Sequence, residues 1–349
     1  MTSTAMAAGA TRGAGQVITY VDGGSNTWAQ AQTLTSSQTT GSAFGNDVDM
    51  NSADSSIVVG APATRNDAQN QTVGAAHFYT LTAGVAWFPQ GPLLRGDGTS
   101  EFFGWSVATS TFPYVVVGAP SSSFGSVQLR GRVYTFQYDS TANSWVSRGS
   151  GTAVVGDDAS DNLGISVDIS DDSSTMVAGA SGHSSFTGAC YIYTWSGNDW
   201  TRASKFIGSS AQENFGASVK ILNSDGSFIA VGGWKYETVK GLVQVYQRQS
   251  DGSYAAYGGP IIGGVSDQIG RPNTITGSVS GGVPTVVLST AQGSVNTYTY
   301  NTSLSKWELT AQTLNSGFSD SPALSGSPNL GKLTGGSQKD NAAVIYSLS

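Results

Sequence analysis

The chain repeats one short pattern at a nearly constant interval, and this repeat limits its fold more than any other feature. A glycine that begins an alternating apolar strand ending in an aromatic residue occurs six times, at Gly15, Gly74, Gly131, Gly188, Gly241 and Gly293. A weaker copy lies at 341–346, and successive copies start 48 to 59 residues apart. No helical periodicity interrupts them, so the repeat predicts an array of small sheets.

Two further markers complete the repeating unit. A large aromatic residue such as Trp145 lies 12 to 14 residues after each glycine, beyond a polar turn, which is the spacing of a β-hairpin. Between the hairpins, a dipeptide such as Phe103-Gly104 opens one strand, and a second apolar strand ends in small residues, as in VVVGAP at 115–120. One unit therefore predicts four short strands, which is the composition of a propeller blade.

The predicted fold class is all-β: a single β-propeller of four-stranded blades over residues 15–349, preceded by a poorly ordered tail at 1–14. The markers indicate 25 strands, where six blades need 24 and seven need 28. We therefore favour six blades, with seven as the alternative. On the six-blade interpretation, Trp28–Leu34 is the outer strand of the last blade, so N- and C-terminal strands close the ring in one blade.

The combination of Phe-Gly, VVGAP and GxVxxY resembles the FG-GAP repeat of algal and bacterial surface proteins and, more distantly, of the integrin α-chain propeller. The resemblance implies a non-catalytic binding or assembly module at a cell surface, outside the cell or on a particle. Its expected roles are cell adhesion or structure, with protein or glycan partners held at propeller faces or edges. A carbohydrate-binding lectin is the alternative, and an enzyme with a site at the central channel is less favoured.

The integrin-like version of the repeat also implies calcium in an aspartate-rich loop before the VVGAP strand. When the chain is aligned on Val58-Val59-Gly60, the ligand positions fall on Val48, Met50, Ser52 and Ser56. Asp47, Asp49, Asn51 and Asp54 are nearby but out of register. The loop is not matched, so no cofactor or metal is assigned, and calcium stays the one ion that the resemblance allows.

The charge balance argues against nucleic acids and membranes as partners. The chain has 16 Lys and Arg against 23 Asp and Glu, a formal charge of −7, which repels phosphate backbones and anionic lipids. No apolar stretch is long enough for direct membrane insertion. No signal peptide is visible at the N-terminus, but the resemblance favours an extracellular or surface-associated location.

The residues that could perform catalysis are few. Cys190 occupies the repeat position of Val17 and Val133, so we expect it to be a buried apolar residue. His77 and His183 are isolated, which argues against a transition-metal site. No nucleophile is paired with a base, so no catalytic residue is predicted.

Three groups of residues remain as ligand or modification sites. Four carboxylates share one register, two residues before the Phe-Gly position: Glu101, Asp161, Glu213 and Asp267. They either form a ring of ligand acceptors or fix their own turns, and the repetition favours turns. Trp105, Trp195 and Trp234 break the repeat and are candidates for stacking on a sugar. Asn70 and Asn301 lie in glycosylation sequons.

Overall fold

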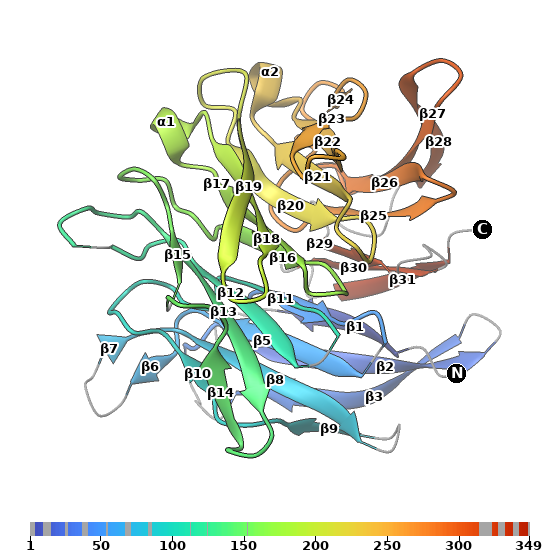
Figure 1. Ribbon diagram of the computed structural model, residues 1–349. Coiled ribbons are helices and arrows are strands. Elements are labelled where there is room, and N and C mark those ends of the chain that lie inside the picture. The colour runs from blue at the N-terminus through green and yellow to red at the C-terminus, as the bar shows by residue number, and fades with distance from the viewer. Residues whose placement is uncertain are drawn as a thin grey trace.

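A computed structural model gives the fold of the chain and confirms the all-β propeller class. It describes residues 4–9, 15–24, 27–36, 41–53, 55–66, 71–82, 86–111, 113–123, 125–151, 153–313, 323–326, 332–337 and 342–347. Seven antiparallel sheets follow one another in chain order, and we number them as blades 1 to 7 (Figure 1).

The strands of the first four blades have the following bounds. Blade 1 contains β1 (Thr4–Gly9), β2 (Gln16–Gly24) and β3 (Thr27–Thr35). Blade 2 contains β4 (Val48–Met50), β5 (Ser56–Ala61), β8 (Ala75–Thr82), β9 (Ala86–Pro89) and β10 (Leu94–Arg95). Blade 3 contains β11 (Ser106–Thr109), β12 (Tyr114–Ala119), β13 (Arg132–Asp139), β14 (Ser144–Ser147) and β15 (Val154–Val155). Blade 4 contains β16 (Ser166–Ile169), β17 (Thr175–Ala180), β18 (Ala189–Trp195) and β19 (Trp200–Ile207).

The remaining blades follow the same order. Blade 5 contains β20 (Phe215–Ile221), β21 (Phe228–Gly233), β22 (Leu242–Arg248), β23 (Tyr254–Ala256) and β24 (Ile261–Ile262). Blade 6 contains β25 (Ile275–Ser280), β26 (Val283–Ser289), β27 (Val295–Asn301) and β28 (Lys306–Thr313). Blade 7 contains β29 (Ala323–Gly326), β30 (Lys332–Ser337) and β31 (Ala342–Ser347). A separate hairpin of β6 (Arg65–Asn66) and β7 (Gln71–Thr72) connects β5 to β8.

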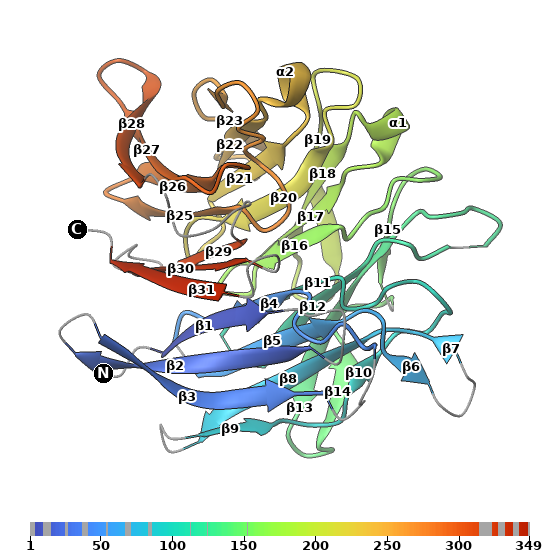
Figure 2. The same ribbon diagram turned by 180° about the vertical axis from the view of Figure 1, so that it is seen from behind.

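The structure has seven blades, so the alternative count of seven holds and the preferred count of six does not. The strand missing from that count is β1, whose sequence TAMAAG carries none of the repeat markers and lies inside the expected tail. The closure also differs, because N-terminal strands form blade 1 and C-terminal strands form blade 7. The ring closes by packing instead of by shared strands: β1 contacts β30 and β31 (Figure 2).

The repeat markers join each blade to the next. The glycine before a third strand forms a parallel bridge with the residue that opens the following blade, as in Gly131 with Leu163 and Gly188 with Phe215. Gly188 has a φ of +85°, and a Cβ there would collide with the backbone of Phe215. Only glycine allows this close approach, which explains why these copies of the pattern begin with glycine.

Apolar side chains fill the space between neighbouring blades. Val116 of blade 3 and Met176 and Tyr191 of blade 4 belong to one such layer, and all three are fully buried. Burial of side chains of this size contributes roughly 1.5–3 kcal/mol each.

In the described ranges, helical content is confined to two four-residue turns, α1 (His183–Phe186) after β17 and α2 (Tyr236–Val239) after β21. Ser184 and Glu237 inside them have positive φ, so these turns are partly left-handed. Among the described residues, no helix has the length and hydropathy needed to span a bilayer.

The first strands of successive blades lie next to one another. β11 contacts β4 on one side and β16 on the other, β20 contacts β16 and β25, and β25 contacts β29. These six inner strands therefore surround the centre of the propeller, so side chains at equal positions along them can meet there.

Candidate functional site

Three charged side chains occupy the same position on three inner strands. Asp49, Asp168 and Lys220 each lie four residues after the glycine of their Phe-Gly-type dipeptide. The corresponding residues of blades 3 and 6, Ala108 and Thr274, carry no charge. The structure brings the three charged residues to one polar pocket of about 80 Å³ at the centre of the propeller. Asp171, Ser52 and Thr109 also line this pocket.

Backbone hydrogen bonds hold both carboxylates of this register. The N–H of Thr109 donates to Asp49 Oδ2 (2.8 Å), and the N–H of Ile221 donates to Asp168 Oδ2 (2.7 Å). Thr109 and Ile221 occupy equivalent positions on the next blade, one residue after the charged register. Each aspartate therefore ties its inner strand to the following one and is held firmly in place.

Asp47 connects blade 2 both to the next blade and to the segment between blades 5 and 6. The N–H of Val107 donates to its Oδ2 (2.8 Å), and the amide of Asn273, between blades 5 and 6, donates to its Oδ1 (3.1 Å). Burial raises the pKa of Asp47 to about 6. Asp47 thus links blade 2 to distant parts of the ring beside the pocket.

Asp49 and Lys220 differ in how their protonation responds to the pocket. Burial raises the pKa of Asp49 to about 7, although the ammonium of Lys220 opposes the shift. Lys220 Nζ lies 3.1 Å from Asp168 Oδ2. Burial disfavours the charged form of Lys220, but the carboxylates of Asp168 and Asp49 outweigh it and raise the pKa of Lys220. Near neutral pH, Asp49 can therefore exchange a proton while Lys220 stays a cation.

A carboxylate that titrates near neutrality and a fixed ammonium group form a useful pair. The carboxylate can take a proton from water, because a general base works best when its pKa is close to the ambient pH. The ammonium can stabilise an oxygen that becomes negative as water adds to a carbonyl carbon. The pocket therefore has the groups needed for hydrolysis of an ester or lactone.

Asp49, Asp168 and Lys220 were not predicted as a set from the sequence, where Asp49 was only a displaced calcium ligand. The structure instead places Asp49 on β4. The following turn is formed through Asn51, whose Oδ1 accepts N–H bonds from Ser55 and Ser56. A signal was present: charges recur at one register of the inner strands, where most residues are apolar or small. Finding it requires knowing which strand faces the centre.

The four carboxylates predicted from the repeat lie in four separate turns, outside the lining of this pocket. Each accepts an N–H from the residue three positions earlier, as Glu101 does from Gly98 (3.0 Å) and Glu213 from Ser210 (3.0 Å). The same bond occurs at Asp161 and Asp267. These contacts match the turn-fixing alternative, and ligand binding by this set stays a prediction.

The three tryptophans that break the repeat are half-buried against neighbouring side chains. Trp105 contacts Phe102, Trp195 contacts Trp200 and Arg148, and Trp234 lies beside Lys235 and Arg271. None of them lines the central pocket. For the sequons, Asn301 accepts N–H bonds from Ser303 and Leu304, and Asn70 lies outside the described residues.

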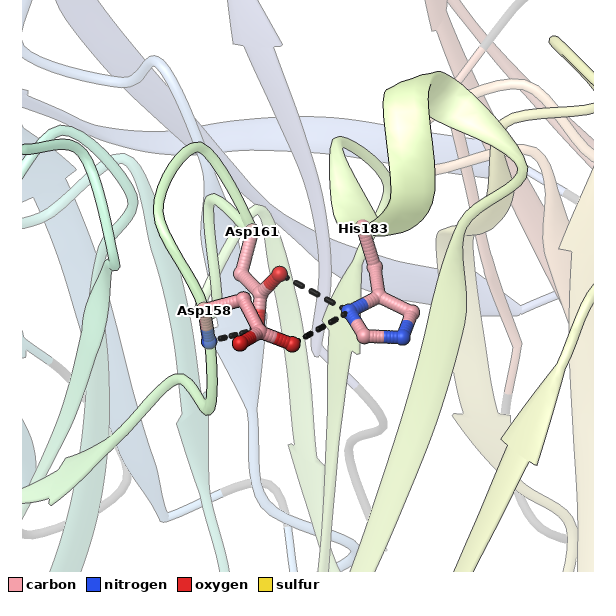
Figure 3. A group of neighbouring side chains, drawn as sticks. All are labelled: Asp158, Asp161 and His183. Atoms are coloured by element: carbon pink, nitrogen blue, oxygen red, sulfur yellow. Dashed lines mark hydrogen bonds and ion pairs between the residues drawn. The ribbon is translucent and has the colours of Figure 1, made fainter.

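A second polar cluster lies between blades 3 and 4, away from the pocket. It consists of Asp158 and Asp161 on the connection before β16 and His183 at the start of α1 (Figure 3). His183 Nδ1 is 2.8 Å from Asp161 Oδ1 and 4.0 Å from Asp158 Oδ2. The structure thus gives His183, which the sequence left isolated, two carboxylate neighbours.

Comparison with known proteins supports the fold at a distance. No protein-family profile matches the chain, and no curated protein matches it. A periplasmic gluconolactonase from Pseudomonas aeruginosa shares the fold with a TM-score of 0.63 and 13% identity, covering 100% of this chain and 92% of that one. A protein from Bacteroides uniformis, provisionally described as a 6-phosphogluconolactonase, has a TM-score of 0.62 and 11% identity, covering 89% of this chain and 82% of that one.

These neighbours correct the family expectation. They are named as lactonases, not as FG-GAP proteins, so the FG-GAP assignment and the roles in adhesion or structure that it implied are wrong. The same finding overturns the expectation of a non-catalytic module with protein or glycan partners, and it gives no support to the lectin alternative. The reason lies in the repeat, whose glycines and aromatics meet the packing needs of blades in general. The periplasmic neighbour is compatible with the expected location outside the cytoplasm.

Proposed function

We propose that the protein is a hydrolase that opens the ring of a sugar lactone at the central pocket. The observation that carries this proposal is the pairing of Asp49, whose pKa is raised to about 7, with the cation of Lys220 in one polar pocket. The names of the two structural neighbours suggest the substrate class. A small molecule is therefore the expected partner.

Each residue has a definite part in the proposed reaction. The carboxylate of Asp49 takes a proton from water as the water oxygen bonds to the lactone carbonyl carbon. The ammonium of Lys220 stabilises the negative carbonyl oxygen of the tetrahedral intermediate. The ring C–O bond then breaks, and the departing alkoxide takes the proton back from Asp49. Asp168 positions Lys220 through their 3.1 Å ion pair.

The charge of the pocket indicates an uncharged substrate. Asp49, Asp168 and Asp171 line it together with a single cation, Lys220, which is already paired with Asp168. A phosphorylated lactone would meet an excess of carboxylates there. We therefore expect an unsubstituted aldonolactone to be preferred over its 6-phosphate.

The first prediction concerns hydrolysis of glucono-δ-lactone, followed as acid release in a pH-stat after subtraction of the spontaneous rate. We expect the purified protein to accelerate the reaction and to act more slowly on the 6-phosphorylated lactone. Asp49→Asn should lower kcat by about 10²- to 10⁴-fold, because it removes the base. The kcat/KM of the wild type should rise with pH through about 7, as Asp49 loses its proton.

Asp139→Asn is the matched control for this test. Asp139 is an aspartate that accepts backbone N–H bonds from Thr141 and Ala142 in an exposed hairpin. This variant should keep full activity. Rates of both lactones equal to those in buffer, or an Asp49→Asn variant as active as the wild type, would refute the proposal.

A further inference from the structure

The cluster of Asp158, Asp161 and His183 gathers three metal-ligating groups in a small space. Their ligand atoms all lie within 4.8 Å of one another. Asp161 and His183 are buried, with 0% and 5% of their side chains exposed, whereas the Asp158 side chain is 72% exposed. The cluster therefore has a buried floor and one side open to solvent, through which an ion can enter.

The neighbouring blade shows what this place looks like without the extra ligands. Around Glu101, the residues at the positions of Asp158 and His183 are Gly98 and Ser122. Ser122 Oγ donates to Glu101 Oε2 (3.0 Å), and Tyr134 donates to the same oxygen (3.1 Å). A carboxylate, a hydroxyl and a tyrosine thus satisfy the structural needs of this turn.

The next blade departs from that pattern twice, and both departures converge on one point. Glycine becomes Asp158 and serine becomes His183, while the tyrosine is kept as Tyr191, whose OH lies 3.3 Å from Asp161 Oδ2. Because the turn needs neither substitution, the added carboxylate and imidazole require another explanation.

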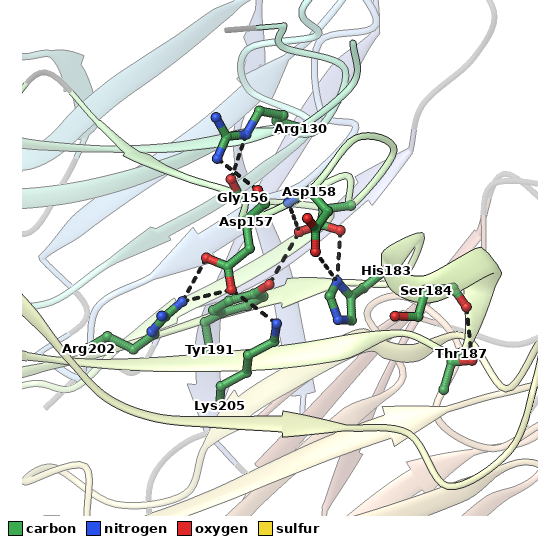
Figure 4. A network of polar contacts seen from close by, with 11 residues as sticks. Arg130, Gly156, Asp157, Asp158, His183, Ser184, Thr187, Tyr191, Arg202 and Lys205 are labelled. Carbon is green, nitrogen blue, oxygen red and sulfur yellow. Dashed lines mark hydrogen bonds and ion pairs between the residues drawn. The ribbon is translucent and has the colours of Figure 1, made fainter. Parts of the chain in front are cut away.

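The surrounding cations do not compete for these two carboxylates. Arg202 and Lys205 bind the adjacent Asp157 at 2.8 and 3.0 Å, and Arg130 donates to the carbonyl oxygens of Gly156 and Asp157 (Figure 4). The loop backbone is therefore held in place. Asp158 and Asp161 remain directed at His183.

We propose that Asp158, Asp161 and His183 bind a divalent transition-metal ion with the ligand preferences of zinc. Zinc takes nitrogen from histidine and oxygen from carboxylates at about 2.0–2.2 Å, which places neighbouring ligand atoms of a tetrahedral site roughly 3.3 Å apart. The separations of 2.8 and 4.0 Å from His183 Nδ1 lie on either side of this value. Small rotations of the exposed Asp158 and of His183 suffice to fit the ion.

Binding exchanges a proton for the metal. The hydrogen between His183 Nδ1 and Asp161 Oδ1 leaves, so that Nδ1 offers its lone pair while the other ring nitrogen carries the remaining proton. The N–H of Asp158 and the OH of Tyr191 keep Asp161 Oδ2 in position, as outer partners of metal ligands do. Solvent completes the coordination on the open side.

The test is metal binding by the whole chain after treatment with a chelator and dialysis. Titration with Co²⁺, a coloured substitute for Zn²⁺, should show one ion bound per chain with visible d–d absorption, and Zn²⁺ should displace it. The melting temperature of the protein should rise on addition of Zn²⁺, because the ion binds only the folded state. The double variant Asp158→Gly, His183→Ser should bind at least about tenfold more weakly.

The repeat itself supplies the controls. The double variant copies Gly98 and Ser122 of the preceding blade, so it should fold, and the single variant Asp158→Asn changes only an exposed side chain. His77→Gln, which copies Gln244 of blade 5, removes the other histidine and should bind cobalt normally. A wild type that binds no cobalt, or a double variant that binds it equally well, would overturn the proposal. Loss of binding in Asp49→Asn alone would place the ion in the central pocket and also overturn it.

Discussion

Asp49 is both a link between two blades and a carboxyl group whose pKa lies near neutral pH. Its Oδ2 accepts the N–H of Thr109 on the next blade, and burial raises its pKa to about 7. An ordinary aspartate loses its proton near pH 3.9, so the folded state holds this proton over a range where the unfolded chain has lost it. The stabilisation is complete below about pH 4 and disappears as the pH rises through 7.

Thermal unfolding of the wild type and of Asp49→Asn between pH 4 and pH 8 tests this pH dependence. The asparagine cannot ionise, and its carbonyl oxygen can still accept the N–H of Thr109. The stability of the wild type should therefore fall relative to the variant as the pH rises, by on the order of 1–2 kcal/mol after allowance for solvent screening. Parallel stability curves for the two proteins would show that Asp49 has an ordinary pKa.

Among the strands, neighbouring blades approach each other so closely at the ends of their second strands that side chains are excluded at fixed places. Gly118 on β12 faces the carbonyl oxygen of Gly164 in the next blade, and a Cβ there would also collide with Ser106. Gly60 and Gly179 occupy the same position on β5 and β17, each against the corresponding glycine carbonyl of the next blade. The small-residue ending of these strands thus lets neighbouring blades meet near the centre.

Chemical denaturation of the variant Gly118→Ala tests this close approach. The added methyl group has backbone on one side and Ser106 on the other, so we expect destabilisation by about 1–3 kcal/mol or more. Gly259 is the matched control, because a Cβ there has nothing within 4 Å. Gly259→Ala should change stability by no more than about 0.5 kcal/mol. Equal effects at the two positions would contradict the close approach of the blades.

At the scale of the whole molecule, the ring depends on contact between its two ends. Blade 1 reaches blade 7 through β1, which pairs with β2 on one side and contacts β30 and β31 (Figure 2). A propeller that closes by packing has no strand shared between its ends. Within the described part of the chain, closure therefore depends on the packing of β1 against β30 and β31.

The corresponding prediction is that deletion of residues 2–14, which removes β1, weakens the ring. The edge of β2 would lose its partner strand, and blade 7 would lose its contact with blade 1. We expect the melting temperature to fall by about 5 °C or more, with self-association visible in gel filtration because an unpaired strand edge is exposed. Deletion of residues 2–3 alone should have no effect, and identical melting of all three proteins would rule out a role for β1 in closure.

Much of the fold could be predicted because its markers are local. The alternating strand after each of the six glycines matches β2, β8, β13, β18, β22 and β27, and the weaker copy at 341–346 matches β31. The strand β1 could not be found in this way, since TAMAAG has no glycine start, no terminal aromatic and no alternation. The number of blades could therefore not be counted from the sequence, because β1 is a strand only through its contacts with neighbouring strands.

The candidate site could be predicted only in part. Asp161 and His183 each stood out in the sequence, but nothing local showed that the loop before β16 and the turn after β17 bring them within 2.8 Å. Asp49, Asp168 and Lys220 come from three different blades and meet only because each blade contributes one strand to the centre. The pKa of Asp49 follows from that meeting, through burial and the nearby charges.

The repeating four-stranded unit and its packing residues follow from local sequence, because strand alternation, turns and glycine requirements act over a few residues. The number of blades, the closure of the ring and the chemistry at its centre come from the folded molecule. Those features arise from contacts between residues far apart in the chain, where the distance between charges and their removal from water decide which groups can hold or move a proton.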